Sequence, residues 1–290
     1  MNQQEIADEF SCSRIKIVRL LKQTLDSGLV HFTISGSNYS LFSLERELKA
    51  AANLKYCLVV PSLPDLSDAL SRGAAYLCND IIQMKGSLGV GLSRTLGRMY
   101  RYLDKEKCRI NSVISICGTT NPNLALTQLN SGFHIAQALE VDFYTIWAPV
   151  IVGPEVDAKS IKQDIYISMV LEMAEKADYA LIGIGNTADS PLLEMEYISD
   201  EDYKTITSSG AEGEILGRYF SMDGKIKNTG TEKRVISVDF PMRCPVIATA
   251  GGLGKSRAIV SVIRSGWIQG LVTDEKAALG VLELLRDQSA

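Results

Sequence analysis

The stretch Tyr56-Cys57-Leu58-Val59-Val60-Pro61 is a short apolar run closed by a proline. Such a run is typical of a strand that is buried on both faces of a parallel sheet. Strand-like and helix-like segments alternate from this point towards the C-terminus. We expect further strands at 86–91, 110–117, 143–150, 179–184, 246–250 and 268–272, and helices at 66–84, 93–103, 124–139, 161–176 and 256–265. This alternation predicts an α/β fold with a mostly parallel, doubly wound sheet covered by helices on both faces.

Four turns that follow expected strands combine glycines with hydroxyl, amide or basic side chains. They are Gly89-Val90-Gly91-Leu92-Ser93-Arg94-Thr95, Cys117-Gly118-Thr119-Thr120-Asn121, Gly183-Ile184-Gly185-Asn186 and Ala250-Gly251-Gly252-Leu253-Gly254-Lys255-Ser256. Ligands of open parallel sheets bind beyond the carboxyl ends of the strands, and backbone N–H groups at strand-to-helix turns favour anions. One glycine turn alone is structural about as often as functional. The recurrence of these turns with Arg94 and Lys255 predicts a pocket for a small phosphorylated ligand.

The turn 250–256 is the best phosphate-binding candidate, but it departs from a nucleotide-binding P-loop. That pattern requires a glycine five residues before Gly254, where Thr249 stands. The chain also has no clear acidic strand to hold Mg²⁺, which argues against an NTPase. We therefore expect no cofactor. The six cysteines, at 12, 57, 78, 108, 117 and 244, lack paired spacing, which indicates buried, reduced thiols and no metal site.

The N-terminal residues predict two short helices joined by a tight turn. Gln4-Glu5-Ile6-Ala7 lies in the first helix, and the second begins after Ser13, a natural N-cap. Its apolar residues Ile17, Leu20 and Leu21 repeat at helical spacing and are expected to face inward. Its other face is cationic, as in a recognition helix that enters the major groove. The candidate DNA-binding residues are Ser13, Arg14, Lys16, Arg19 and Lys22.

A hairpin is expected directly after these helices. Residues 28–34 are strand formers, 35–38 supply a turn, and 39–42 can pair back as a second strand. Two helices and a hairpin make a winged helix-turn-helix. The alternative interpretation is an amphipathic surface helix with solvated lysines and arginines. We expect a linker helix at 43–50 and two domains, a DNA-binding domain at 1–53 and a ligand-binding domain at 54–290.

Composition limits the function further. The chain has 290 residues, 46% of them apolar, and a formal net charge of −4. No apolar run approaches the roughly 20 residues of a membrane span, and no signal peptide is recognisable, so a cytoplasmic protein without a membrane partner is expected. A net negative charge argues against a protein that coats nucleic acid over its whole surface. DNA binding would then depend on the cationic face of the second helix.

The order of these segments resembles the SorC family of sugar-responsive bacterial transcriptional regulators over nearly the whole chain. The matching stretches are 4–7, 13–21, 28–30, Gly89 to Leu96, Gly210-Ala211-Glu212-Gly213-Glu214-Ile215-Leu216-Gly217, Ala250-Gly251-Gly252 through Lys255, and Leu271-Val272-Thr273-Asp274. The resemblance implies a dimer or tetramer that binds operator DNA and a sugar phosphate. It also implies a large domain similar to glucosamine-6-phosphate deaminase and ribose-5-phosphate isomerase.

By the same resemblance, Glu214 would hydrogen-bond sugar hydroxyls and Lys255 would hold the phosphate. The candidate effector-binding residues are Gly89, Gly91, Ser93, Arg94, Thr95, Gly118, Thr119, Thr120, Glu214, Gly251, Gly252 and Lys255. The chain departs from the family in three respects. Almost nothing precedes Gln3 where the family has another helix, Leu92 and Ser93 replace an aromatic residue and a glycine, and Glu214 replaces an aspartate.

Two other functions remain open. An isomerase or deaminase acting on sugar phosphates would need a general base. The only histidines are His31, in the expected wing, and His134, in an expected helix, and neither lies on a ligand loop. The acidic residues Asp178, Glu212, Glu214 and Asp274 remain as acid or base candidates. A fold shared with enzymes is no evidence of turnover, so we expect no enzyme. The short N-terminus suggests the second alternative, an effector-binding protein without DNA binding.

Overall fold

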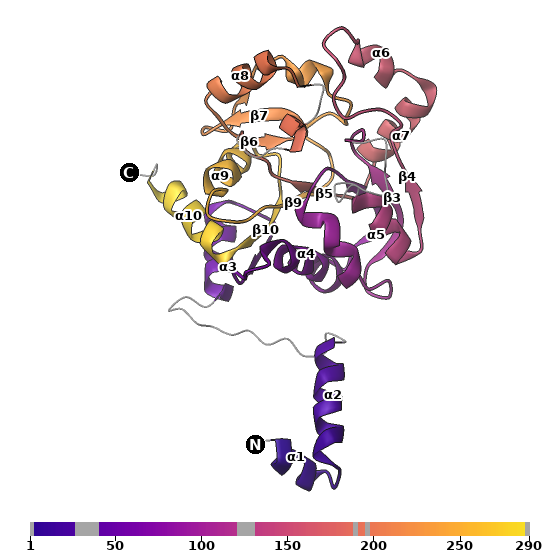
Figure 1. The fold of residues 1–290 in the computed structure, drawn as a ribbon, viewed down its shortest axis with the longest axis vertical. Coiled ribbons are helices and arrows are strands. Elements are labelled where there is room, and N and C mark those ends of the chain that lie inside the picture. Colours follow the sequence, from indigo (N-terminus) through magenta and orange to yellow (C-terminus); the bar gives the residue numbers. More distant parts are fainter. Residues whose placement is uncertain (1–2, 27–40, 121–130, 188–190, 195–197, 288–290) are drawn as a thin grey trace. The chain divides into compact units, whose positions relative to one another are not determined.

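The computed structural model describes residues 3–26, 41–120, 131–187, 191–194 and 198–287 (Figure 1). These residues belong to two units, Met1–Ser40 and Leu41–Ala290. The boundary thus falls earlier than the expected position after residue 53. Helix α3 (Leu41–Ala51) packs against β1 and α10 of the larger unit and buries Leu44 and Leu48 completely. The helix expected to link the domains is therefore part of the larger one.

The N-terminal unit contains α1 (Gln3–Glu9) and α2 (Arg14–Asp26). Ala7 is fully buried, and Ser13 Oγ accepts a hydrogen bond from Lys16 N–H at 3.3 Å, as its predicted N-cap position requires. Ile17 is buried, but Leu20 and Leu21 are exposed in this unit, contrary to expectation.

The expected wing lies mostly outside the described residues, which resume at Leu41. Its second strand was expected to include Leu41 and Phe42. Both residues instead begin α3, because the apolar side chains that follow recur at helical spacing and bury Leu44 and Leu48.

The larger unit is built on a parallel sheet of seven strands. In spatial order these are β1 (Tyr56–Val60), β10 (Gly270–Asp274), β9 (Val246–Thr249), β5 (Tyr179–Gly183), β2 (Lys85–Val90), β3 (Arg109–Ser115) and β4 (Asp142–Tyr144). Leu181 and Ile247 pack in one hydrophobic core, while their neighbours Ile182 and Ala248 pack in the other. Burial on both faces explains the uninterrupted apolar runs of the sequence.

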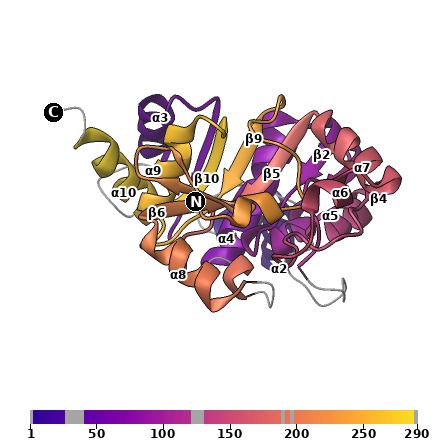
Figure 2. The same ribbon diagram turned by 90° about the horizontal axis from the view of Figure 1, so that it is seen from above.

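Helices cover both faces of this sheet, as predicted (Figures 1 and 2). One core contains residues of α4 (Leu66–Tyr76), which continues as the π-helix η1 (Leu77–Ile82), of the 3₁₀ helix η2 (Thr95–Tyr102) and of α5 (Ser131–Leu139). The other contains residues of α3, α6 (Ala158–Lys162), α7 (Ile165–Glu175), α9 (Ser256–Ser265) and α10 (Glu275–Arg286). No helix in the described ranges is long and apolar enough to span a membrane.

A second, antiparallel sheet was not expected from the sequence. It consists of β6 (Ala211–Ile215), β7 (Arg218–Ser221) and β8 (Ile226–Lys227). The helical segments η4 (Pro191–Glu194), α8 (Asp200–Ser208) and η5 (Thr231–Arg234) lie before and after its strands in the chain. A bridge between Gly185 and Glu214 connects β6 to the turn after β5. The small sheet thereby reaches the carboxyl edge of the large one.

The order of the strands reverses at β2. From β2 the chain proceeds outward to β3 and β4, and then returns to β5 on the other side of β2 before continuing to β9 and β10. The connections that leave β2 and β5 consequently lead to opposite halves of the sheet. Such a switch point is where ligands bind in open α/β sheets.

Candidate ligand-binding site

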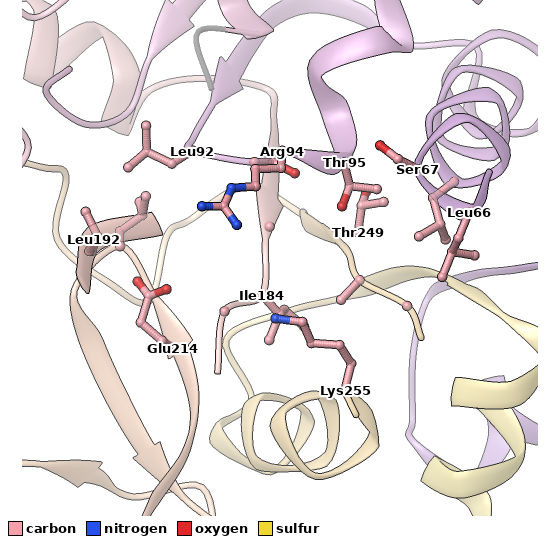
Figure 3. A pocket seen from close by; sticks show the side chains of 17 residues that line it. Leu66, Ser67, Leu92, Arg94, Thr95, Ile184, Leu192, Glu214, Thr249 and Lys255 are labelled. Carbon is pink, nitrogen blue, oxygen red and sulfur yellow. The ribbon is translucent and has the colours of Figure 1, made fainter. Parts of the chain in front are cut away.

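A cavity of about 250 Å³ lies at this switch point (Figure 3). Its walls come from the turns after β2, β5 and β9, from the start of α4 and from the small sheet. The lining residues are Leu66, Ser67, Leu70, Leu92, Ser93, Arg94, Thr95, Gly183, Ile184, Gly185, Leu192, Glu214, Leu216, Thr249, Ala250, Gly251 and Lys255. The volume suits one small molecule.

The turns after β2 and β5 are packed tightly against each other. Gly183 N–H donates to Leu92 O at 3.2 Å. A Cβ added at Gly183 would lie 3.0 Å from that same oxygen and 3.1 Å from Ser93 Cβ. Ser93 is itself buried, and its hydroxyl accepts Leu96 N–H at 3.1 Å, which fixes the first turn of η2. The glycine at the end of β5 thus allows the two turns to meet.

Glu214 is a buried carboxylate held at the cavity wall. Its backbone exchanges two hydrogen bonds of 2.9 Å with Gly185, and its Oε1 accepts Gly217 N–H at 2.6 Å. The side chain is 5% exposed. Glu214, Arg94 and Lys255 are seen in Figure 3 to extend from three different elements towards the cavity.

The cavity has a mixed polar and apolar lining. Arg94 precedes η2, and Lys255 occupies the N-cap position of α9 without a side-chain capping bond. Two cations and a helix N-terminus favour an anion, whereas a fixed carboxylate accepts hydrogen bonds from hydroxyl groups. The apolar lining is formed by Leu66, Leu70, Leu92, Ile184, Leu192 and Leu216. The lining therefore combines groups that can bind an anion with a carboxylate that can accept hydrogen bonds from hydroxyl groups.

Burial shifts the pKa values of two ionisable groups close to Glu214. Burial raises the pKa of the Cys117 thiol to about 12. Burial also lowers the pKa of Arg218, whose Nη1 donates to Ser237 Oγ at 2.9 Å. No histidine or cysteine is found among the described residues that line the cavity.

Six of the predicted effector-binding residues line the cavity and six do not. Ser93, Arg94, Thr95, Glu214, Gly251 and Lys255 line it, whereas Gly89, Gly91, Gly118, Thr119, Thr120 and Gly252 lie outside the lining. A Cβ at Gly89 would lie 2.6 Å from Ile116 Cγ2, and one at Gly118 would overlap Ala148 O. These two glycines permit close packing of the chain, which is the structural use of glycine that the sequence could not distinguish from ligand binding.

Several lining residues were not predicted. Leu66, Ser67 and Leu70 come from the first turns of α4, for which the sequence has no ligand-binding signal. Gly183, Ile184 and Gly185 belong to one of the four turns that follow expected strands, although they are not among the candidate effector-binding residues. Thr249 ends β9, is 1% exposed, and its Oγ1 has no hydrogen-bond partner among the described residues.

The predicted DNA-binding residues lie on or just before α2. Ser13, Arg14, Lys16 and Arg19 are exposed, and the side chain of Lys22 lies outside the described ones. The cationic face predicted from the sequence is thus accessible on the helix. It remains a candidate nucleic-acid interface.

A family model and curated relatives match most of the chain. The model of the family described as "Putative sugar-binding domain" matches residues 37–283. The erythritol catabolism regulatory protein EryD of Brucella abortus is 27% identical, over 97% of this chain and 92% of its own length. The transcriptional regulator LsrR of Klebsiella pneumoniae is also 27% identical, over 98% of this chain and 89% of its own length.

Solved structures share the fold. The full-length sorbitol operon regulator SorC from Klebsiella pneumoniae has a TM-score of 0.75 at 21% identity, and the match covers 97% of this chain and 94% of SorC. A transcriptional regulator from Streptococcus pneumoniae has a TM-score of 0.73 at 19% identity, covering 86% of this chain and 98% of that one. Similarity to the sugar-phosphate deaminase and isomerase folds remains a prediction.

Proposed function

This chain belongs to the sugar-binding domain family of SorC-type regulators, and we propose that it is a DNA-binding transcriptional regulator of carbohydrate metabolism genes controlled by a phosphorylated sugar. The observation that carries the proposal is the cavity at the β2/β5 switch point, where Arg94 and Lys255 share a lining with the buried Glu214 carboxylate. The cations and the N-terminus of α9 would hold the phosphate. Glu214 would accept hydrogen bonds from the sugar hydroxyls.

The cationic face of α2 supports DNA as the second partner. Arg14, Lys16 and Arg19 are all exposed on α2. Exposed cations on one helix can neutralise phosphates and reach base edges in the major groove. Operators read by such helices are usually paired half-sites, so a homodimer or homotetramer is part of the proposal. The effector would act by binding one state of the larger unit more tightly than another.

An enzyme acting on the same ligands is the less favoured candidate. The cavity lining contains carboxylate, hydroxyl and basic groups but, among the described residues, no histidine or cysteine that could serve as base or nucleophile. The curated relatives EryD and LsrR are named as regulators. Binding without turnover accounts for both observations.

Selection of bound fragments from source DNA tests the proposal. The protein is incubated with the fragments at fixed, near-physiological salt, with and without a pool of sugar phosphates. Enrichment of a paired half-site that changes with the pool is the expected result. No enrichment under either condition would contradict the DNA-binding function, and an assay of sugar-phosphate turnover would then separate an enzyme from a simple binding protein.

A further inference from the structure

The buried Asp274 carboxylate joins three segments at the carboxyl edge of the sheet. Asp274 ends β10 and is 1% exposed. Its Oδ1 accepts Gly252 N–H, from the turn after β9, at 2.7 Å. Its Oδ2 accepts the hydroxyl of Ser62, from the turn after β1. Ser62 Oγ in turn accepts Lys276 N–H in the first turn of α10, at 3.1 Å.

Asp274 occupies the N-cap position of α10 but makes no capping bond to that helix. An aspartate at this position normally accepts a hydrogen bond from one of the first helical N–H groups, which stabilises the helix. Here Ser62 accepts the Lys276 N–H in its place. Both carboxylate oxygens of Asp274 accept hydrogen bonds from other segments, so this side chain does not serve to cap α10.

The turn after β9 lies directly against the carboxylate. A Cβ added at Gly251 would lie 2.6 Å from Asp274 Oδ1. Gly252 has a φ of +103°, a conformation that favours glycine. Lys255 N–H donates to Gly252 O at 3.0 Å. The position of Gly252 therefore sets the position of Lys255, which lines the cavity and is the N-cap of α9.

We propose that Asp274 is a positioning residue for the ligand site, which holds the turn Gly251 to Lys255 in its binding conformation without touching the ligand. The identity of the ligand as a phosphorylated sugar rests on the proposed function, but the positioning role does not. Asp274 does not line the cavity, whereas Gly251 and Lys255 do. When the turn is already fixed, its phosphate-binding groups are in position before the ligand binds. Less conformational entropy is then lost on binding.

Hydrogen–deuterium exchange of the ligand-free full chain tests the positioning role. In Asp274→Ala, amides of residues 250–255 should exchange about tenfold faster, because Gly252 N–H loses its acceptor. Asp274→Asn should remain close to wild type, since the amide oxygen can still accept that bond. Thr273→Val is the matched control, because the neighbouring Thr273 hydroxyl is buried without a hydrogen-bond partner among the described residues. Unchanged exchange in Asp274→Ala, or faster exchange throughout the larger unit, would overturn the proposal.

Binding of inorganic phosphate to the same variants supplies a second measurement. Asp274→Ala should bind phosphate about tenfold more weakly than wild type, while Asp274→Asn and Thr273→Val should retain most of the affinity. Full affinity in Asp274→Ala would overturn the link between the turn and the site. If the wild-type chain bound neither phosphate nor any sugar phosphate, the proposed function would fail, and the exchange rates would still decide whether Asp274 holds the turn.

Discussion

Gly185 and Glu214 are joined by two backbone hydrogen bonds of 2.9 Å each, across the boundary between the large parallel sheet and the small antiparallel one. The bridge brings the Glu214 side chain over the turn after β5. Glycine has no side chain, so position 185 leaves room for the Glu214 carboxylate. A Cβ added there would overlap Glu214 Oε2. The two sheets thus both contribute to the wall of the cavity, through a glycine and a carboxylate.

Substituting Gly185 should displace the carboxylate while the fold survives. In Gly185→Ala the new methyl group takes the space of Oε2, and the end of a side chain moves more easily than backbone. We expect affinity for a sugar phosphate to fall about tenfold or more, the effect of losing a charged hydrogen-bonding group. Isothermal titration calorimetry measures the affinity, and circular dichroism verifies the fold.

Gly153→Ala is the matched control for this substitution. Gly153 lies outside the cavity lining, and a Cβ added there would lie 4.0 Å from Val156 Cγ2, an ordinary contact. This variant should bind the sugar phosphate almost as tightly as wild type. If both variants and the wild type had equal affinities, Glu214 would not contribute to ligand binding.

Lys255→Ala should weaken effector binding and leave DNA binding unchanged. A charge-assisted hydrogen bond contributes about 1.5–3 kcal/mol, which corresponds to a loss in affinity of roughly 10- to 100-fold. Arg257→Ala is the control, because Arg257 is exposed on the same helix and pairs with Glu212 at 2.6 Å outside the cavity lining. An effector affinity in Lys255→Ala equal to that of Arg257→Ala would exclude Lys255 as a phosphate ligand.

Arg19→Ala should have the opposite effect and weaken DNA binding. Loss of a contact to a DNA base weakens the binding free energy by about 1–3 kcal/mol. Loss of a contact to a DNA phosphate instead reduces the slope of log affinity against log salt concentration by about 1. Sugar-phosphate affinity should not change. Lys233→Ala, which removes an exposed cation from the larger unit, controls for the change in net charge. Fluorescence anisotropy with the selected operator at several salt concentrations distinguishes the two effects, and DNA affinity equal to wild type would contradict the recognition-helix assignment.

The parts of the fold that could be predicted are those with a local signal. The helix expected at 256–265 has those bounds in the structure, because apolar side chains recur at helical spacing before Gly266, which ends the helix with a φ of +73°. The strand expected at 143–150 ends already at Tyr144, and bridges of Pro149 to Thr119 and of Ile151 to Val235 follow it. Such long-range pairing leaves little trace in the local sequence.

The small sheet was missed for a similar reason. The β6 sequence Ala211-Glu212-Gly213-Glu214-Ile215 places a buried glutamate where strand patterns require an apolar residue. Gly217, three residues further along the chain, donates its N–H to that carboxylate, and Gly185 pairs with the Glu214 backbone from the turn after β5. The site was predictable where strand ends carry polar residues, as at Arg94 and Lys255. It was not predictable for Leu66 or Leu70, which reach the cavity through the packing of α4.

Thr249→Val should raise stability and lower ligand affinity at the same time. The buried Thr249 hydroxyl lines the cavity without a hydrogen-bond partner among the described residues, and an unsatisfied buried polar group costs about 1–3 kcal/mol. Valine has nearly the same shape, so the free energy of unfolding should increase by about 1 kcal/mol. Urea denaturation of the ligand-free chain measures this change.

A ligand that satisfies the Thr249 hydroxyl should bind about three- to tenfold more weakly to Thr249→Val, the range expected for one neutral hydrogen bond. Thr273→Val serves as the control, because its hydroxyl is equally buried and unsatisfied but does not line the cavity. That variant should gain stability without losing affinity. The same affinity in both variants would show that the ligand does not use the Thr249 hydroxyl, since burial and chemistry are matched and only the position relative to the cavity differs.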